Sequence, residues 1–153
     1  MVKATTEEVF KVARVEDYTL HQPPEVSAVR LYARDGTGGP DPENLRIDMR
    51  TKISSEWNKE VIRILLRDVL KKKKTKEAWK DLPNHSNAYF MDIIRDQLEC
   101  ARTTWRNAQP KLLESGEIES LAAVENRMIE SRDVSSKMRR ANMRRINVGL
   151  PIP

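Results

Sequence analysis

The sequence predicts a mainly α-helical protein with a three-helix core, a further C-terminal helix and a flexible N-terminal region. Between residues 55 and 109, apolar residues recur at intervals of three and four, which is the period of a helix that buries one face. Pro83 and Pro110 divide this stretch at points where helices must end. With 39% hydrophobic and only 5% aromatic residues, we expect a modest core built mainly from aliphatic side chains.

Residues 1–44 are expected to form an N-terminal extension and a linker. Thr5 and Glu8 have the spacing of a capping box, which favours a helix that starts there. The β-branched residues that follow, and those of residues 26–32, favour strands instead, so a weak β-hairpin is the alternative. Residues 35–42 combine three glycines with two prolines, a composition that neither helix nor sheet tolerates. A linker is therefore predicted there.

A helical core domain is expected over residues 45–111. Apolar and charged residues alternate over residues 45–53, which is the pattern of a short strand or an extended lead-in. Residues 54–56, Ser-Ser-Glu, then supply a cap and a first-turn acid for a helix that reaches about Lys74. A short second helix is predicted over residues 75–82 and ends at the proline that follows.

The third helix has the most regular apolar period in the chain. Ser86 or Asn87 caps it, and Pro110 requires it to end at or before Gln109. Its apolar residues follow one another at steps of four, four, three, four and three. They are Phe90, Ile94, Leu98, Ala101, Trp105 and Ala108.

Residues 112–153 are assigned to a fourth helix and a basic tail. Gly116 breaks the chain, and the apolar residues from Ile118 to Met128 then indicate a helix with a thinner apolar stripe. Residues 137–145 hold five Lys and Arg and no acid. We expect this segment to be a disordered arm that follows the phosphates of a nucleic acid.

The net charge of +5 is distributed unevenly. Residues 1–50 hold seven Lys and Arg against nine Asp and Glu, whereas residues 51–153 hold 21 against 14. A polyanion partner would therefore bind the second part. Cys100 is the only cysteine, which fits a reducing compartment. No apolar run is long enough to span a membrane and no signal peptide is recognised, so we expect an intracellular protein without a membrane partner. With a nucleic acid as its partner, the protein is expected in the nucleus.

We predict no catalytic site, no metal site and no cofactor. The only two histidines, His21 and His85, show no spacing that suggests a Ser-His or Cys-His pair. One cysteine with two histidines cannot close a structural zinc site. Asp92, Asp96 and Glu99 share one face of the third helix, but interleaved arginines make a solvated, ion-paired face the better interpretation.

Two basic clusters and the third helix are the candidate nucleic-acid contacts. Residues 71–74 are four lysines at the end of the first long helix, where the helix dipole also favours cations. Because four successive like charges repel one another, a polyanion contact or an import signal is an equal alternative to helix stabilisation. On the third helix, Arg, Thr and Asn side chains offer contacts to base edges and phosphates. The predicted contact residues are Lys71, Lys72, Lys73, Lys74, Arg102, Thr103, Arg106, Asn107, Arg139, Arg140, Arg144 and Arg145.

Two features stand out in the core domain: the three tryptophans, Trp57, Trp79 and Trp105, and the Arg-x-x-Trp-Arg-Asn run at residues 102–107. In both features the chain resembles the Myb/SANT group, in particular its trihelix and MADF branch. The resemblance covers about residues 55–111. It implies that the three tryptophans are core residues and that the third helix contacts DNA through the arginines, threonine and asparagine named above. From the core domain through the basic tail, the chain is also similar to uncharacterised fungal proteins, which implies no activity.

We therefore predict non-enzymatic binding of a nucleic acid, DNA before RNA, with the third helix recognising sequence and the lysine and arginine clusters contacting phosphates. The alternative is a helical protein–protein interaction module, in which the basic clusters serve import or solubility. Steep salt dependence of binding to duplex DNA would favour the first hypothesis.

Overall fold

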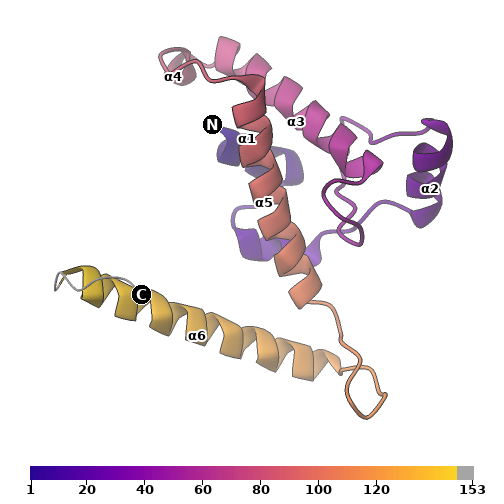
Figure 1. The fold of residues 1–153 in the computed structure, drawn as a ribbon, viewed down its shortest axis with the longest axis vertical. Coiled ribbons are helices and arrows are strands. Elements are labelled where there is room, and N and C mark those ends of the chain that lie inside the picture. The colour runs from indigo at the N-terminus through magenta and orange to yellow at the C-terminus, as the bar shows by residue number, and fades with distance from the viewer. Residues whose placement is uncertain (148–153) are drawn as a thin grey trace. The chain divides into compact units, whose positions relative to one another are not determined.

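The computed structural model describes the backbone of residues 1–147, with side chains for residues 1–134, 137, 138 and 140. Over that range the protein has six α-helices, one 3-10 helix and no strand, so the prediction of a mainly α fold is confirmed (Figure 1). The chain divides into two compact units. We call them the first unit, Met1–Arg106, and the second unit, which starts at Asn107.

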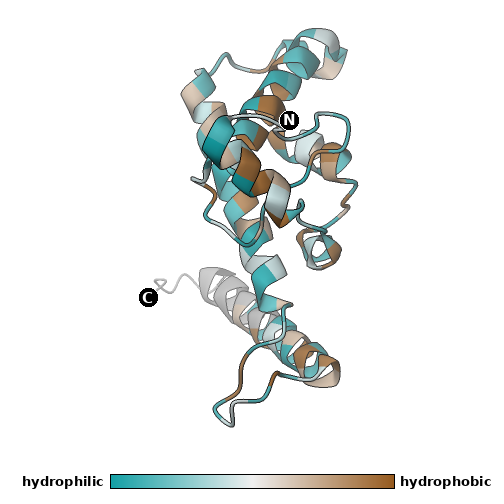
Figure 2. Ribbon diagram, turned by 90° about the vertical axis from the view of Figure 1, so that its right-hand side faces the viewer, coloured by the Kyte–Doolittle hydropathy of each residue, from teal (hydrophilic) through white to brown (hydrophobic). Residues whose placement is uncertain are grey.

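The core of the first unit is built mainly from α3 (Glu56–Thr75) and α5 (Asn87–Asn107). Both helices bury a stripe of residues at the predicted intervals of three and four. Figure 2 shows brown apolar positions among teal polar ones along the helices of this unit. Full burial of one such aliphatic side chain stabilises the fold by about 1.5–3 kcal/mol. The apolar residues with no exposed surface are Ile47, Met49, Val61, Leu65, Val69, Ile94, Leu98 and Ala101.

The ends of α3 and α5 are set by residues that the sequence analysis named. Ser55 is the N-cap of α3, and its Oγ accepts a hydrogen bond from a first-turn backbone amide at 3.4 Å. Of the two candidate caps of α5, Ser86 makes the bond, since its Oγ accepts from a backbone amide at 3.2 Å. α5 ends ahead of Pro110, as predicted. The short helix α4 (Glu77–Lys80) lies inside the segment predicted for the second helix.

The N-terminal region is helical, so the β-hairpin alternative is wrong. It forms α1 (Val2–Phe10), the 3-10 helix η1 (Val15–Leu20) and α2 (Val26–Asp35). The local β preference of the valines is overridden because α1 and α2 both pack against α3. Val2 and Tyr18 join the same hydrophobic core as α3 and α5. The region expected to be a flexible extension is therefore part of the first unit.

Residues 45–53 form an irregular segment whose backbone is held by a side chain of α3. Asn58 is fully buried, and its Oδ1 accepts a hydrogen bond from the Asp48 amide at 2.9 Å. Its Nδ2 donates to the carbonyls of Asp48 and Lys52 at 3.0 and 3.1 Å. These bonds take the place of a neighbouring strand, which explains why the predicted alternation appears without a sheet. The buried apolar residues of this segment are Leu45, Ile47, Met49 and Ile53.

Two of the three tryptophans pack on the core, and the third does not. Trp57 is buried and its Nε1 donates to the Arg46 carbonyl at 2.9 Å. Trp105 is partly buried against the same core, and its Nε1 donates to a backbone carbonyl at 3.0 Å. The prediction of a core position for Trp79 is wrong, because α4 spans only four residues and presents no apolar stripe to α3 and α5. Trp79 instead lies under the Lys76 ammonium group, 4.7 Å from the ring centre.

The predicted linker is irregular in structure but is packed against the first unit. Gly36 ends α2 in the left-handed region, with φ of 69°. A Cβ atom at Gly39 would lie 2.8 Å from the ring of Tyr32, so the backbone approaches that ring as only glycine allows. Tyr32 in turn meets Trp57 edge-on, with ring centres 5.9 Å apart, and Pro40 is buried.

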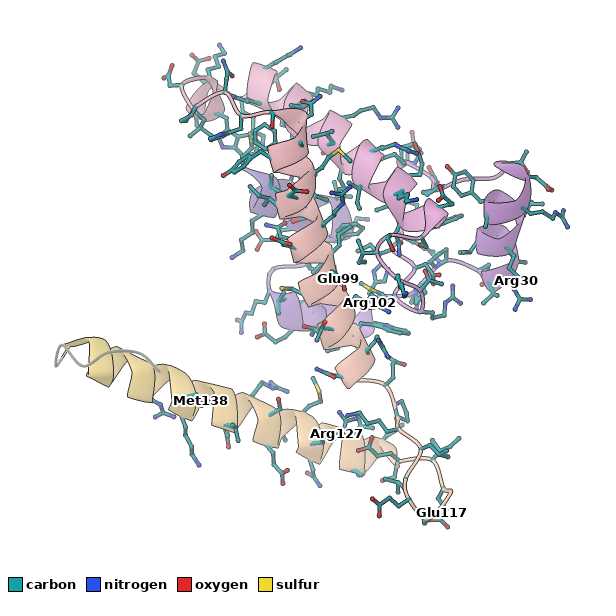
Figure 3. The ribbon with its side chains drawn as sticks, viewed as in Figure 1. Arg30, Glu99, Arg102, Glu117, Arg127 and Met138 are labelled. Carbon is teal, nitrogen blue, oxygen red and sulfur yellow. The ribbon has the colours of Figure 1, made fainter. Side chains whose placement is uncertain are left out.

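The second unit consists of a turn followed by α6 (Leu121–Asn147). An isolated antiparallel bridge joins Leu112 to Ile118, so α6 starts later than the position predicted from Ile118. Glu119 is buried, and the guanidinium of Arg127 donates to its carboxylate at 2.8 and 2.9 Å. This ion pair fastens the turn to the first part of α6, where Figure 3 labels Arg127. The hydrogen bonds from Arg127 hold the pKa of Glu119 below the ordinary value.

Candidate nucleic-acid interface

The lysines at the end of α3 have different surroundings. Lys71 and Lys74 are exposed, and neither ammonium group is paired with a carboxylate of the described residues. The Lys72 side chain is only 15% exposed, and its Nζ lies 2.9 Å from Asp68 and 3.1 Å from Glu8. Burial lowers the pKa of Lys72, but hydrogen bonds to these two carboxylates outweigh burial and raise it overall. Lys72 therefore ties α3 to α1.

The fourth lysine, Lys73, holds the loop that follows α4. Its Nζ donates to the Pro83 carbonyl at 2.9 Å and to Asn84 Oδ1 at 2.7 Å. Beside it is a hollow of about 270 Å³ whose lining includes Lys74 and Lys80 as well as Lys73. Lys80 is paired with a glutamate of α4. Lys73 is thus a structural residue at the edge of a positively charged hollow.

An exposed row of cations runs along α3 and includes two arginines that the sequence analysis missed. Arg63, Arg67, Lys71 and Lys74 are exposed and follow one another at steps of four, four and three, so they share one side of the helix. We call these four residues the basic face of α3. Arg63 and Arg67 lie 3.0 and 3.7 Å from the Glu60 carboxylate, so their charges are partly compensated. The helical spacing from Lys71 was the signal that could have found them.

The predicted contact residues of α5 differ in exposure. The Arg102 side chain is 15% exposed and lies 3.5 Å from Glu99, and its Nε is buried without a hydrogen-bond partner among the described residues. Figure 3 labels both side chains on the same stretch of α5. Thr103, Arg106 and Asn107 are exposed. Most of the Arg102 side chain is therefore covered, whereas the other three predicted contacts on α5 are open to a ligand.

The exposed surface of α5 also carries carboxylates. Asp92, Asp96 and Glu99 are all exposed, and Arg95 lies 2.8 Å from Asp92. Carboxylates on a helix that approaches phosphates add repulsion and weaken binding. Within the part of the chain that the structure describes, no group of three or more His, Cys, Asp and Glu could hold a metal ion.

The basic tail is helical in its backbone, since residues 137–145 belong to α6 and do not form the predicted disordered arm. Arg140 is exposed. The side chains of the other predicted contacts in this segment, Arg139, Arg144 and Arg145, lie outside the described residues.

Of the two histidines, His21 has a structural position. Its Nε2 lies 3.2 Å from the amide nitrogen and 3.1 Å from the carbonyl oxygen of Ile47, so it links the N-terminal region to residues 45–53. Burial lowers the pKa of His21. The ring of His85 lies against that of Tyr89, with centres 4.1 Å apart.

Comparisons of the chain with protein-family models, with curated proteins and with solved structures found no match. The resemblance to the Myb/SANT group therefore stays a prediction, and the function has to be inferred from the geometry of the charged residues. Within residues 1–147, no helix has both the length and the apolar character that crossing a bilayer requires.

Proposed function

We propose that the protein is a non-enzymatic nucleic-acid-binding protein that contacts phosphates through the basic face of α3. The observation that supports this proposal best is the pair Lys71 and Lys74, two exposed ammonium groups without carboxylate partners in the described chain. The helix dipole also favours lysines at a helix C-terminus. It does not account for Arg63 and Arg67 on the same side of the helix, beyond the reach of the last turn.

The dimensions of the basic face suit a nucleic-acid backbone. From Arg63 to Lys74 the face extends about 16 Å along the axis of α3, since an α-helix rises 1.5 Å per residue. This length corresponds to roughly five base pairs of duplex DNA at 3.4 Å each. Phosphate contacts give affinity and salt dependence without sequence information, so we expect binding that tolerates many sequences.

A second version of the same proposal takes α5, the third helix of the sequence analysis, as the helix that recognises sequence. It requires Arg106, Thr103 and Asn107 to reach base edges while Asp96 and Glu99 stand nearby on the helix. The basic face of α3 has one carboxylate, Glu60, in contact with its first two members only. The balance of charge therefore favours α3 as the contact helix.

Binding of short duplex DNA at several salt concentrations, measured by fluorescence anisotropy, tests the proposal. The double variant Lys71→Gln/Lys74→Gln should weaken binding of all sequences alike and reduce the slope of log K against log salt by about 0.9 per lost phosphate contact. The matched control, Arg30→Gln/Arg34→Gln on α2, removes the same charge and should leave most of that slope. Equal losses in the two variants would show that net charge alone drives binding, and no binding by the parent protein would refute the proposal.

Exposed apolar side chains of the second unit favour a different function, protein–protein interaction. Leu112, Ile118 and Leu121 are 74%, 73% and 80% exposed and lie within ten residues of one another. Large aliphatic side chains grouped on a surface often mark a site that a partner covers. If this function is correct, sedimentation analysis should show self-association or a stable partner complex that Leu112→Gln/Leu121→Gln disrupts. A monomeric protein that binds DNA would favour the first proposal.

A further inference from the structure

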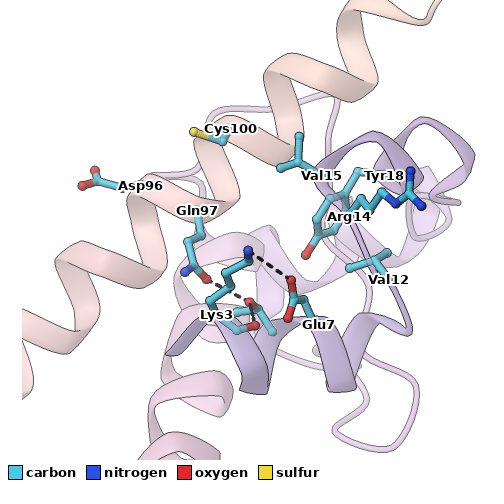
Figure 4. Close-up of a pocket in the computed structure, with 10 residues that line it drawn as sticks. Lys3, Glu7, Val12, Arg14, Val15, Tyr18, Asp96, Gln97 and Cys100 are labelled. Atoms are coloured by element: carbon cyan, nitrogen blue, oxygen red, sulfur yellow. Dashed lines mark hydrogen bonds and ion pairs between the residues drawn. The ribbon is translucent and has the colours of Figure 1, made fainter. Parts of the chain in front are cut away.

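A cavity of about 320 Å³ lies between α1, η1 and α5 in the first unit, on residues that the nucleic-acid proposal does not use (Figure 4). Lys3, Glu7, Val12, Val15, Tyr18 and Cys100 are among the residues that line it. A volume of this size is at the lower end of the range for small-molecule sites in proteins. Most of the surface around it is apolar, with a few polar groups, which is the usual composition of such sites.

Tyr18 is the residue that indicates a ligand. Its side chain is 6% exposed, and no group of the described chain hydrogen-bonds to its hydroxyl. Figure 4 shows this hydroxyl pointing towards the space beside Lys3 and Glu7. The ring packs against Phe10, which meets it edge-on with centres 5.9 Å apart. The hydroxyl is not among the buried unsatisfied groups of the described chain, so it is open to the cavity and available to hydrogen-bond a molecule bound there.

The groups around this hydroxyl favour an uncharged ligand. Lys3 and Glu7 lie 3.7 Å apart, so their charges largely compensate each other. Arg14 and Asp96 also line the cavity, so its charged groups are two cations and two carboxylates. Burial and the nearby Glu7 carboxylate raise the pKa of Tyr18, so its hydroxyl stays protonated and can donate a hydrogen bond. Val12 and Val15 supply an apolar wall on the η1 side of the cavity (Figure 4).

We propose that this cavity binds a small, uncharged, mainly apolar molecule with a carbonyl oxygen, which accepts a hydrogen bond from the Tyr18 hydroxyl. The apolar body of the ligand lies against Val12 and Val15. Gln97, whose Oε1 accepts a hydrogen bond from Thr6 Oγ1 at 2.8 Å, is a fixed part of the opposite wall.

Two probes of nearly identical shape test the proposal on the full chain, acetophenone with a carbonyl oxygen and ethylbenzene without one. Titration followed by amide NMR shifts should show saturable binding of both probes. Tyr18→Phe keeps the ring and should weaken acetophenone about three- to tenfold, because one hydrogen bond is lost, without changing the affinity for ethylbenzene. Val15→Trp, at a position that is 45% exposed and therefore tolerates a larger side chain, should fill the cavity and abolish binding of both probes.

The single cysteine reports the place of binding. Cys100 is exposed and lines the same cavity, so bound acetophenone should slow its alkylation by iodoacetamide in the parent protein and not in Val15→Trp. Equal effects of Tyr18→Phe on the two probes, or alkylation that acetophenone does not slow, would each overturn the proposal. Absence of saturable binding at millimolar concentrations would overturn it as well.

Discussion

Asn58 should be one of the most sensitive polar residues of the protein, because a single buried amide holds the backbone of residues 45–53. Asn58→Ala removes three hydrogen bonds, of 2.9, 3.0 and 3.1 Å, and leaves the Asp48 amide buried without its acceptor. Each bond contributes about 0.5–1.5 kcal/mol net, and an unsatisfied buried group costs about 1–3 kcal/mol. We expect the free energy of unfolding to fall by roughly 3–5 kcal/mol.

Urea denaturation followed by circular dichroism at equilibrium measures this change. Thr103→Ala, at an exposed position of α5, is the control and should stay within about 0.5 kcal/mol of the parent protein. Asn58→Asp should also be destabilising, because a carboxylate cannot donate to the two carbonyls. If Asn58→Ala unfolds at the same urea concentration as the control, the segment is held by apolar contacts alone and the hydrogen-bond argument is wrong.

Three further predictions concern other parts of the fold. Trp57→Ala should cost about 3–5 kcal/mol of stability, whereas Trp79→Ala should cost about 1 kcal/mol or less, since its cation–π contact is partly exposed; thermal melts compare them. Because burial holds the pKa of His21 below the ordinary 6.5, the unfolded chain takes up that proton first as the pH falls, so stability should decline below about pH 6.5. His21→Gln should flatten that part of a stability–pH curve, and an unchanged curve would contradict the assignment. Because Arg127 lowers the pKa of Glu119, the stability that the ion pair contributes should be present above pH 4.5 and lost on acidification. Glu119→Gln should therefore reduce the acid-induced loss of helicity.

Helices α3 and α5 could be predicted because their signals are local. Ser55 sits before an apolar stripe at steps of four, and Pro110 cannot continue a helix, so the bounds of α3 and α5 follow from neighbouring residues. The structure of α1 could not be predicted in the same way. Its valines prefer strands locally, and only the surface of α3, far along the chain, supplies the packing that makes the helix favourable.

Dependence on distant parts of the chain also explains why the structure of residues 45–53 and the position of Trp79 could not be predicted. The alternation of apolar and polar residues correctly identified the buried side, but the hydrogen-bond partner is a side-chain amide of α3, which no strand rule anticipates. A tryptophan in a helical segment suggests a core position, yet α4 is a single short turn. Tyr18 gave no signal in the sequence, because its unpaired hydroxyl is recognisable only with the cavity around it.

The sequence shows which residues are charged but not which groups each charge contacts, and this determines how the nucleic-acid proposal has to be tested. Residues 71–74 are four identical side chains, but Lys72 bridges to Glu8 and Asp68 and Lys73 holds the Pro83 carbonyl. Replacing all four lysines would remove ties within the fold together with any phosphate contacts, and a loss of DNA binding would then have two causes. Lys71→Gln/Lys74→Gln removes the same number of charges as Lys72→Gln/Lys73→Gln. A comparison of the two variants therefore separates the loss of phosphate contacts from the loss of ties within the fold. Lys71→Gln/Lys74→Gln should lower the salt slope of DNA binding at unchanged thermal stability. Lys72→Gln/Lys73→Gln should lower thermal stability at an unchanged salt slope. The reverse pattern would mean that the basic face of α3 is not the contact surface.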